Sequence, residues 1–394
     1  MTRLTRLATA AMCALTLALP AVTASAAPAP GPATPVSPSA TGDVHPELPR
    51  PTGPYAVGRS TLHLVDRARR DPWVPEARPR ELMVTLFYPA RGGSGSPARY
   101  ATIEEARLYL RSQGVPDAAT AEALSATGTS GRTGAVPVPG SHPLVVLSPG
   151  FGAPRYSLTG LAEELAARGY VVAALDHAHE SVGTEFPGGR MLTCRACEQV
   201  RTEEDLRAVT VGRARDVSFV LDRLTGPRPA WRYAHLIDRR RIGAGGHSIG
   251  GAAALSAMAG DHRVRVGVNL DGAVHDPVPD SGLGGRPVLM LGTDDGVHRP
   301  GGRDATWDRT WRRLDGWKRW LTVAGADHLS FSDHSVLAEQ LGLPGPAPAL
   351  PGTRAIALTR EFVAGCFDLH LRHIPQPELD GPTPADPEVV FHSP

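Results

Sequence analysis

The sequence predicts one α/β domain built on a mostly parallel, doubly wound sheet with helices on both faces. Short apolar runs rich in Val, Leu and Ile alternate with longer helical patterns, which is the order of parallel strands joined by crossover helices. The runs are continuously apolar, as in strands that are covered on both faces. A chain of 394 residues is long enough to bury the core of one large domain.

The expected strands span residues 81–88, 143–148, 170–175, 241–246, 264–270, 287–291 and 319–323. The expected helices span residues 157–168, 202–224, 252–259, 306–314 and 353–373. Gly169 directly follows the first helix, and Thr202 precedes two glutamates at the start of the second, as residues at helix ends do. Two long excursions, near 101–140 and 178–200, remain between these elements. We expect them to rise over the site as a cap or substrate wall.

The N-terminus has the pattern of a secretory signal peptide, residues 1–26. Arg3 and Arg6 precede an apolar run, which is followed by the small-residue pattern Ala24-Ser25-Ala26. The run is shorter than the roughly 20 residues that a membrane span needs, so we expect cleavage and export. Residues 27–54 are rich in Pro, Ala and Ser and are expected to form a linker before the folded domain at 55–394.

Charge and cysteine content narrow the class of protein. Lys and Arg number 41 and Asp and Glu 40, with no basic stripe, so nucleic acid is not an expected partner. Export favours a disulfide, which we expect between Cys194 and Cys197, with Cys366 free and buried. No second Cys-x-x-Cys or His pair completes a set of four ligands, so no metal and no other cofactor is expected.

The chain contains one Gly-x-Ser-x-Gly, at Gly246-His247-Ser248-Ile249-Gly250. An apolar run ends there and a helix of small residues follows, which is the context of a nucleophile elbow, a strained turn between strand and helix. The helix N-terminus favours negative charge beside the serine hydroxyl. We therefore expect Ser248 to be a nucleophile.

A serine nucleophile needs a base, and the base needs an acid to orient it. In the chain order Ser, acid, His, the base follows the last strand, and His328 holds that place. The acid is either Asp271, at the end of the strand after the elbow, or Asp294, at the end of the next strand. Spacing alone does not separate the two.

The developing oxyanion needs two backbone N–H donors. We expect one from Ile249, directly after the nucleophile, and the other from Phe151, in the glycine-containing loop 148–152. His177 and His179 have a spacing compatible with metal ligands. A strand-end loop that shapes the pocket rim is the preferred interpretation.

These residues resemble the plasma-type (isoform II) platelet-activating factor acetylhydrolases, which are lipoprotein-associated phospholipases A2. The resemblance covers roughly residues 80–372 and rests on segments 143–155, 170–177, 237–252, 268–271 and 326–333, which look like the family's oxyanion loop, next strand, elbow, acid position and histidine loop. It implies an α/β-hydrolase fold, Asp271 as the acid, no catalytic metal, and hydrolysis of short or oxidised acyl groups at the second glycerol carbon. The chain departs from the family at Pro149-Gly150, where His-Gly is usual, and an amphipathic lipoprotein-docking surface is not evident.

We therefore predict a secreted serine esterase that hydrolyses short-acyl esters, in particular platelet-activating factor-like or oxidised phospholipids, through an acyl-enzyme on Ser248. Contact with a lipid surface would be transient, and the oligomeric state is left open. The alternative is a secreted lipase or cutinase-like carboxylesterase acting on soluble esters or polyesters. A non-catalytic binding protein of this fold would have lost the serine, the histidine or the oxyanion glycines, and none is lost here.

Overall fold

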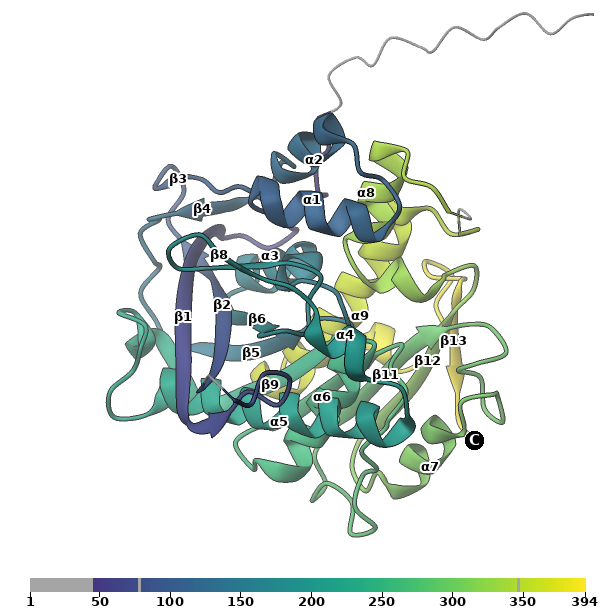
Figure 1. Cartoon of the computed structure of the whole chain (residues 1–394). Coiled ribbons are helices and arrows are strands. Elements are labelled where there is room, and N and C mark those ends of the chain that lie inside the picture. The colour runs from purple at the N-terminus through teal and green to yellow at the C-terminus, as the bar shows by residue number, and fades with distance from the viewer. Residues whose placement is uncertain (1–44, 77–78, 346–347) are drawn as a thin grey trace, which may run out of the picture. The chain divides into compact units, whose positions relative to one another are not determined.

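The computed structural model describes residues 45–76, 79–345 and 348–394. Its main feature is an eleven-stranded sheet with the order β13-β12-β11-β10-β9-β5-β6-β2-β1-β4-β3 (Figure 1). The strands are β1 (Ala56–Arg70), β2 (Pro79–Ala90), β3 (Ser96–Pro97), β4 (Gly131–Thr133), β5 (His142–Ser148), β6 (Val171–His177), β9 (Ile237–His247), β10 (Val266–Leu270), β11 (Val288–Thr293), β12 (Lys318–Val323) and β13 (Val389–His392).

The centre of the sheet is parallel. β6, β5, β9, β10, β11 and β12 pair in parallel, whereas β2 and β13 join this block by antiparallel pairing. The carboxyl ends of the central strands lie level, because Ser148 of β5 pairs with Gly246 of β9 and His247 pairs with Leu270 of β10. The predicted α/β fold with a mostly parallel sheet is confirmed. Ligand sites of such sheets lie at this carboxyl edge.

Helices cover both faces of the sheet (Figure 1). One core packs the sheet against α5 (Glu203–Thr225), α6 (Ile249–Gly260) and Trp307 of α7 (Ala305–Arg313), and the other packs it against α3 (Thr159–Ala167) and α9 (Gly352–Arg372). Strand residues alternate between the cores: Leu144 and Val146 of β5 lie in the first, Val145 and Leu147 in the second. Burial on both faces explains why the strands read as continuous apolar runs.

The two excursions have secondary structure of their own. The first contains α1 (Ile103–Ser112), α2 (Ala118–Ser125) and β4, and it buries Leu110 and Leu124 against Tyr156 and Leu337 of α8 (His334–Leu341). The second contains the hairpin of β7 (Thr184–Phe186) and β8 (Arg190–Leu192) and the short helix α4 (Arg195–Gln199).

The folded domain begins before residue 55, so the predicted linker, residues 27–54, extends too far at its C-terminal end. Leu48 is buried in the same cluster as α1 and α2, and its backbone N–H donates to Gly128 O at 3.0 Å. Thr52 donates to Glu164 through both its backbone N–H and its hydroxyl. A proline-rich composition did not prevent packing here, because one leucine and a few donors find partners in α2 and α3. The expected signal peptide and the linker up to residue 44 lie outside the described residues.

The structure contains elements that the sequence patterns did not indicate, among them β1, β13, α1, α2 and α8. β1 pairs with β2 and mixes buried, half-buried and exposed positions, so it has no continuous apolar run. Among the described helices, none is long and apolar enough to cross a membrane.

Candidate active site

Ser248 occupies the one-residue turn between β9 and α6. Its φ is 55°, a left-handed conformation that costs a non-glycine residue on the order of 1–3 kcal/mol. A hydrogen bond from its backbone N–H to Leu270 O, 2.7 Å long, holds the turn against β10. Glycine is required at Gly250, because a Cβ there would lie 2.0 Å from Ser148 O. These are the features of a nucleophile elbow.

Asp271 follows β10 and is also left-handed, with a φ of 54°. The turn is tied by the Asn269 side chain, which donates to Gly272 O at 2.7 Å and accepts from Gly272 N at 3.1 Å. Oδ1 of Asp271 accepts from the backbone N–H of Thr293 at 2.7 Å and from its hydroxyl at 3.1 Å. This arrangement fixes the carboxylate and leaves Oδ2 for His328.

His328 pairs with that second oxygen. Its Nδ1 lies 2.6 Å from Asp271 Oδ2, and its side chain is 50% exposed. Nε2 of His247 lies 2.6 Å from the backbone O of His328 and so fastens the histidine loop to β9. A carboxylate only accepts hydrogen bonds, so Nδ1 of His328 carries the proton and Nε2 is free to accept one.

Ser248 and His328 line the same pocket, and within the described residues no hydrogen bond joins them. Free hydrolases often have a loose contact here that tightens when substrate binds. For proton transfer, Ser248 Oγ and His328 Nε2 must come within hydrogen-bond distance of each other.

The surroundings of Asp271 favour its ionised form. Burial by itself raises the pKa of this carboxyl group, but the neighbouring His298 and His328 outweigh burial and hold the pKa well below its usual range. Burial, with His328 nearby, lowers the pKa of His247 to about 4, so the His247 ring is neutral near pH 7. The site thus places an ionised acid beside the candidate base.

Asp294, the other candidate acid, is engaged elsewhere. Its two oxygens accept from Arg299 at 2.7 and 2.6 Å, and one of them also accepts from the Thr322 hydroxyl at 2.8 Å. The structure therefore places Asp271, not Asp294, against His328.

The site opens into a pocket of about 290 Å³. It is lined by Phe151, Leu206, Ser248, Ile249, Asp271, Ala273, His275, Val297, His298, Asp304 and His328. The expectation that 101–140 and 178–200 form its walls is wrong, because the described pocket is walled by α5 and by the segments after β10 and β11. The first excursion instead buries its own apolar residues against α8, and the second packs behind the loop that follows β5.

Both expected oxyanion donors, Phe151 and Ile249, line this pocket. Ile249 is the first residue of α6, where a backbone N–H has no partner within the helix. Phe151 lies in the loop after β5. The structure thus brings both residues to the same pocket as Ser248.

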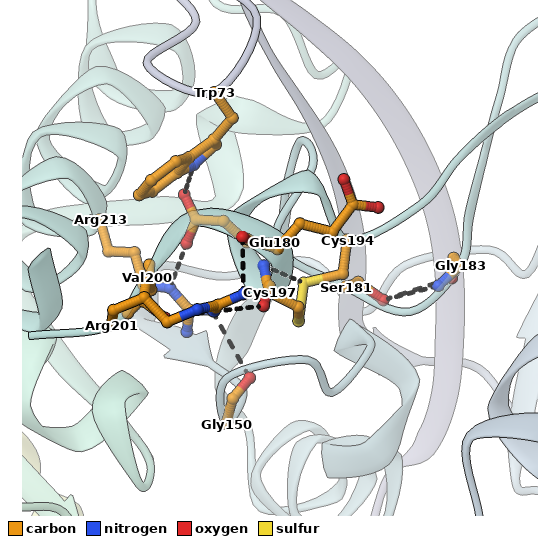
Figure 2. The surroundings of a disulfide bond; sticks show 11 residues. Trp73, Gly150, Glu180, Ser181, Gly183, Cys194, Cys197, Val200, Arg201 and Arg213 are labelled. Carbon is orange, nitrogen blue, oxygen red and sulfur yellow. Dashed lines mark hydrogen bonds and ion pairs between the residues drawn. A yellow bond between two sulfur atoms is a disulfide. The ribbon is translucent and has the colours of Figure 1, made fainter.

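The loop that carries Phe151 is held by its carbonyl groups. Figure 2 shows Arg213 of α5 reaching from Glu180 to this loop, where it donates to Gly150 O at 3.5 Å and also to Pro149 O. Its Nε donates to Glu180 at 2.7 Å. The second excursion pairs with the loop as well, since Gly152 N donates to Glu180 O at 3.0 Å. These contacts fix the backbone from which the Phe151 N–H projects.

A second Ser–His–Asp set lies at the end of β5. His177 Nδ1 is 2.7 Å from Asp216 Oδ2, and His177 Nε2 is 3.0 Å from Ser148 Oγ. The three residues are at most 2% exposed, and Arg213 also donates to Ser148 Oγ at 3.3 Å. The expectation that His177 shapes the pocket rim is therefore wrong. Asp216 and Ser148 provide the polar partners that allow the imidazole to be buried.

Cys194 and Cys197 are joined by a disulfide at the start of α4 (Figure 2). Cys366 is free and buried. In the part of the chain that the structure describes, no group of three or more His, Cys, Asp or Glu side chains is placed to hold a metal ion.

Sequence reasoning missed several residues that build the site: Asn269, Thr293, His298 and Arg213. Thr293 ends an apolar run next to the strand of Asp271, which is a signal that could have been used. His298 lies in a loop and Arg213 lies in the middle of the long helix α5. At neither position does a local sequence pattern distinguish the residue from one on the surface.

Comparisons show which known proteins this chain resembles. A family model described as platelet-activating factor acetylhydrolase, isoform II, matches residues 41–187. A probable 1-alkyl-2-acetylglycerophosphocholine esterase of Arthroderma benhamiae is 28% identical over 375 residues, which cover 87% of this chain and 93% of that protein. A platelet-activating factor acetylhydrolase of Cavia porcellus is 25% identical over 272 residues, 58% of this chain and 56% of that protein.

A solved structure is also similar. It is described as a ferulic acid esterase from Streptomyces cinnamoneus and has 43% sequence identity and a TM-score of 0.79. The match covers 89% of this chain and 100% of the esterase chain. The similar proteins thus include one described as an esterase of an alkyl-acetyl glycerophosphocholine and one described as an esterase of ferulic acid, which is an aromatic acid.

Proposed function

This chain belongs to the isoform II family of platelet-activating factor acetylhydrolases, within the α/β-hydrolases, and from that premise we propose that it is a serine esterase with the triad Ser248, His328 and Asp271. The predicted family and the predicted class of carboxylic-ester hydrolase are both confirmed by the relatives. One observation carries the serine mechanism: His328 pairs with Asp271 at 2.6 Å in a pocket that the strained Ser248 also lines.

In the first half-reaction, Ser248 Oγ attacks the ester carbonyl carbon and its proton passes to His328 Nε2. Asp271 stabilises the imidazolium that forms. The backbone N–H groups of Phe151 and Ile249 stabilise the negative oxygen of the tetrahedral intermediate. When that intermediate collapses, the ester C–O bond breaks and the leaving alcohol takes the proton from His328.

In the second half-reaction, water attacks the acyl-enzyme. His328 Nε2 takes a proton from the water, the same two N–H groups hold the new oxyanion, and Ser248 Oγ leaves with the proton from His328. The products are a carboxylic acid and the free enzyme. None of these steps draws on a metal or cofactor.

We propose short-acyl esters as substrates, with acyl groups from about acetyl to butyryl, and platelet-activating factor-like or oxidised phospholipids as the physiological class. The relatives described as acetylglycerophosphocholine esterase and platelet-activating factor acetylhydrolase support this class. The pocket supports the short acyl group, because it has about 290 Å³ and three aliphatic side chains other than Ile249, those of Leu206, Ala273 and Val297.

A second candidate substrate is a soluble ester of an aromatic acid. The observation that favours it is the 43% identity with the ferulic acid esterase, which is higher than the 28% identity with the acetylglycerophosphocholine esterase. This candidate corresponds to the carboxylesterase alternative, and it uses the same triad.

A substrate panel tests these proposals. Purified wild type and Ser248→Ala are compared on a 2-acetyl phospholipid, p-nitrophenyl butyrate, methyl ferulate and a long-chain triglyceride, with kcat/KM as the readout. We expect the phospholipid and the short ester to be turned over faster than the triglyceride, and Ser248→Ala to be inactive on all four. A kcat/KM highest for methyl ferulate assigns the enzyme to the soluble-ester class, and a highest value for triglyceride rejects the short-acyl proposal.

We further propose that the protein is exported. The N-terminal pattern supports export, and so does the Cys194–Cys197 disulfide, since disulfides persist in oxidising compartments. Expression of the full chain in a secreting host should release a product whose N-terminal sequence starts at Ala27. Retention of the intact chain inside the cell contradicts this proposal.

A further inference from the structure

The carboxylate of Asp271 lies between two histidines. Oδ2 faces His328, as described above, whereas Oδ1 lies 2.8 Å from Nδ1 of His298. The proposed function uses the first histidine only. The second comes from the segment after β11 and lines the same pocket.

His298 is held tightly in its place. It is 5% exposed, its ring lies 4.5 Å from the Trp307 ring, and its backbone O accepts from Trp320 Nε1 at 2.8 Å. Its Nε2 lies 3.5 Å from Oδ2 of Asp304. The two carboxylates thus flank this ring, one near each of its nitrogens.

Two flanking carboxylates favour the charged imidazole. Burial alone lowers the pKa of His298, but Asp271 and Asp304 outweigh it and raise the pKa to about 9. The next residue, Arg299, is paired with Asp294. His298 is thus a cation at neutral pH, and it shares the Asp271 carboxylate with His328.

The other titratable groups near His328, His247 and Asp327, do not supply a positive charge. The ring of His247 lies 4.6 Å away and is neutral. Asp327, its neighbour in the chain, accepts from Leu329 N at 3.0 Å and from the Ser330 hydroxyl at 2.8 Å. His298 is therefore the positive charge that disfavours protonation of His328, because both rings lie beside the Asp271 carboxylate.

We propose that His298 is a positioning residue of the triad, whose positive charge lies 2.8 Å from Oδ1 of Asp271 and keeps His328 deprotonated and ready to act as a base. The inference rests on the proposed function, because it requires Asp271 and His328 to be triad members. A carboxylate with one cationic neighbour stabilises a second cation less than a carboxylate without one. Removing the charge of His298 should therefore favour the protonated, inactive form of His328.

The test compares His298→Gln with His275→Gln by the pH dependence of kcat/KM on p-nitrophenyl butyrate. His275 is the matched control, because it lines the same pocket but pairs with the exposed Glu203 at 2.8 Å. We expect the acid limb of the profile to move to higher pH by about 0.5–1 unit in His298→Gln and to stay in place in His275→Gln. An acid limb that stays in place in both variants overturns the inference.

This outcome is separable from failure of the proposed function. An unshifted limb in an active His298→Gln enzyme rejects the role of His298 and leaves the triad intact. Full activity of His328→Ala would instead reject the triad.

A second measurement serves if His298→Gln does not fold. NMR of the ¹⁵N-labelled histidine rings in the wild type should show one buried imidazolium that persists to about pH 9, and Asp304→Asn should lower the pH at which it titrates. The absence of a ring that stays protonated above pH 8, or an unchanged titration in Asp304→Asn, contradicts the inference.

Discussion

The molecule contains two Ser–His–Asp sets, one at the end of β9 and one at the end of β5. In both sets a histidine Nδ1 lies within 2.7 Å of an aspartate oxygen, at 2.6 Å for His328 and 2.7 Å for His177. In the buried set, Nε2 of His177 even reaches the Ser148 hydroxyl at 3.0 Å. By residue type and spacing alone, the buried set looks more complete than the open one.

The surroundings distinguish the two sets. Ser248 has a φ of 55° and lines a pocket with Phe151 and Ile249, whereas Ser148 belongs to a regular strand and is 2% exposed. The Ser148 hydroxyl is also occupied on both sides, because it bonds to His177 and accepts from Arg213. A triad therefore needs access, a projecting serine and oxyanion donors, whereas the buried set of the same residues joins β5 and β6 to α5.

The largest expected difference is between the two serines. Ser248→Ala should reduce kcat on p-nitrophenyl butyrate by at least about a thousandfold, because the nucleophile is gone. Ser148→Ala should cost less than about tenfold in kcat, while destabilising the fold by about 1–3 kcal/mol through the partners left unpaired. Steady-state kinetics and urea unfolding measure both effects, and a thousandfold loss in Ser148→Ala would break the comparison.

The two candidate acids give the next difference. Asp271→Asn should lower kcat by on the order of a thousandfold, since His328 loses its carboxylate partner while the shape is kept. Asp294→Asn, which disturbs only the bonds to Arg299 and Thr322, should lower kcat by less than about tenfold. The reverse pattern would move the acid to Asp294.

A smaller effect is expected from the support of the oxyanion loop. Arg213→Lys keeps a buried positive charge but loses the fork that bonds to Glu180 and to the carbonyls of Pro149 and Gly150. We expect kcat to fall by about ten- to a hundredfold with little change in KM, because a displaced N–H weakens transition-state binding. Arg215→Lys, on the exposed side of the same helix, is the control. Equal kcat and KM values for the two variants would show that the Arg213 hydrogen bonds do not affect the rate of the reaction.

The central sheet and the open site could be predicted from the sequence because both have local signals. Seven buried strands appear as apolar runs, and the elbow appears as a glycine-flanked serine between a run and a helix. Ser248, His328, Phe151 and Ile249 follow from the positions of strand ends, whereas strand ends left Asp271 and Asp294 open and the family resemblance favoured Asp271. The structure brings all five predicted site residues to one pocket.

The remaining features depend on contacts between distant parts of the chain. Asp216 lies in the middle of α5, and nothing in its neighbourhood indicates a bond to His177, 39 residues away. His298 has no periodic context, and its role appears only when β10 and β11 lie side by side. The excursion 101–140 has few bulky apolar residues, and it packs because Leu48, Tyr156 and Leu337, from other parts of the chain, complete the cluster around its Leu110 and Leu124.

The most direct test of the central claim is covalent labelling of the wild type with a fluorophosphonate, followed by peptide mass spectrometry. Such a reagent reports the serine that has a working base, an accessible hydroxyl and an oxyanion site. We predict one adduct, on Ser248, which disappears in Ser248→Ala and His328→Ala and persists in Ser148→Ala. An adduct on Ser148, or labelling that survives in Ser248→Ala, would contradict the account.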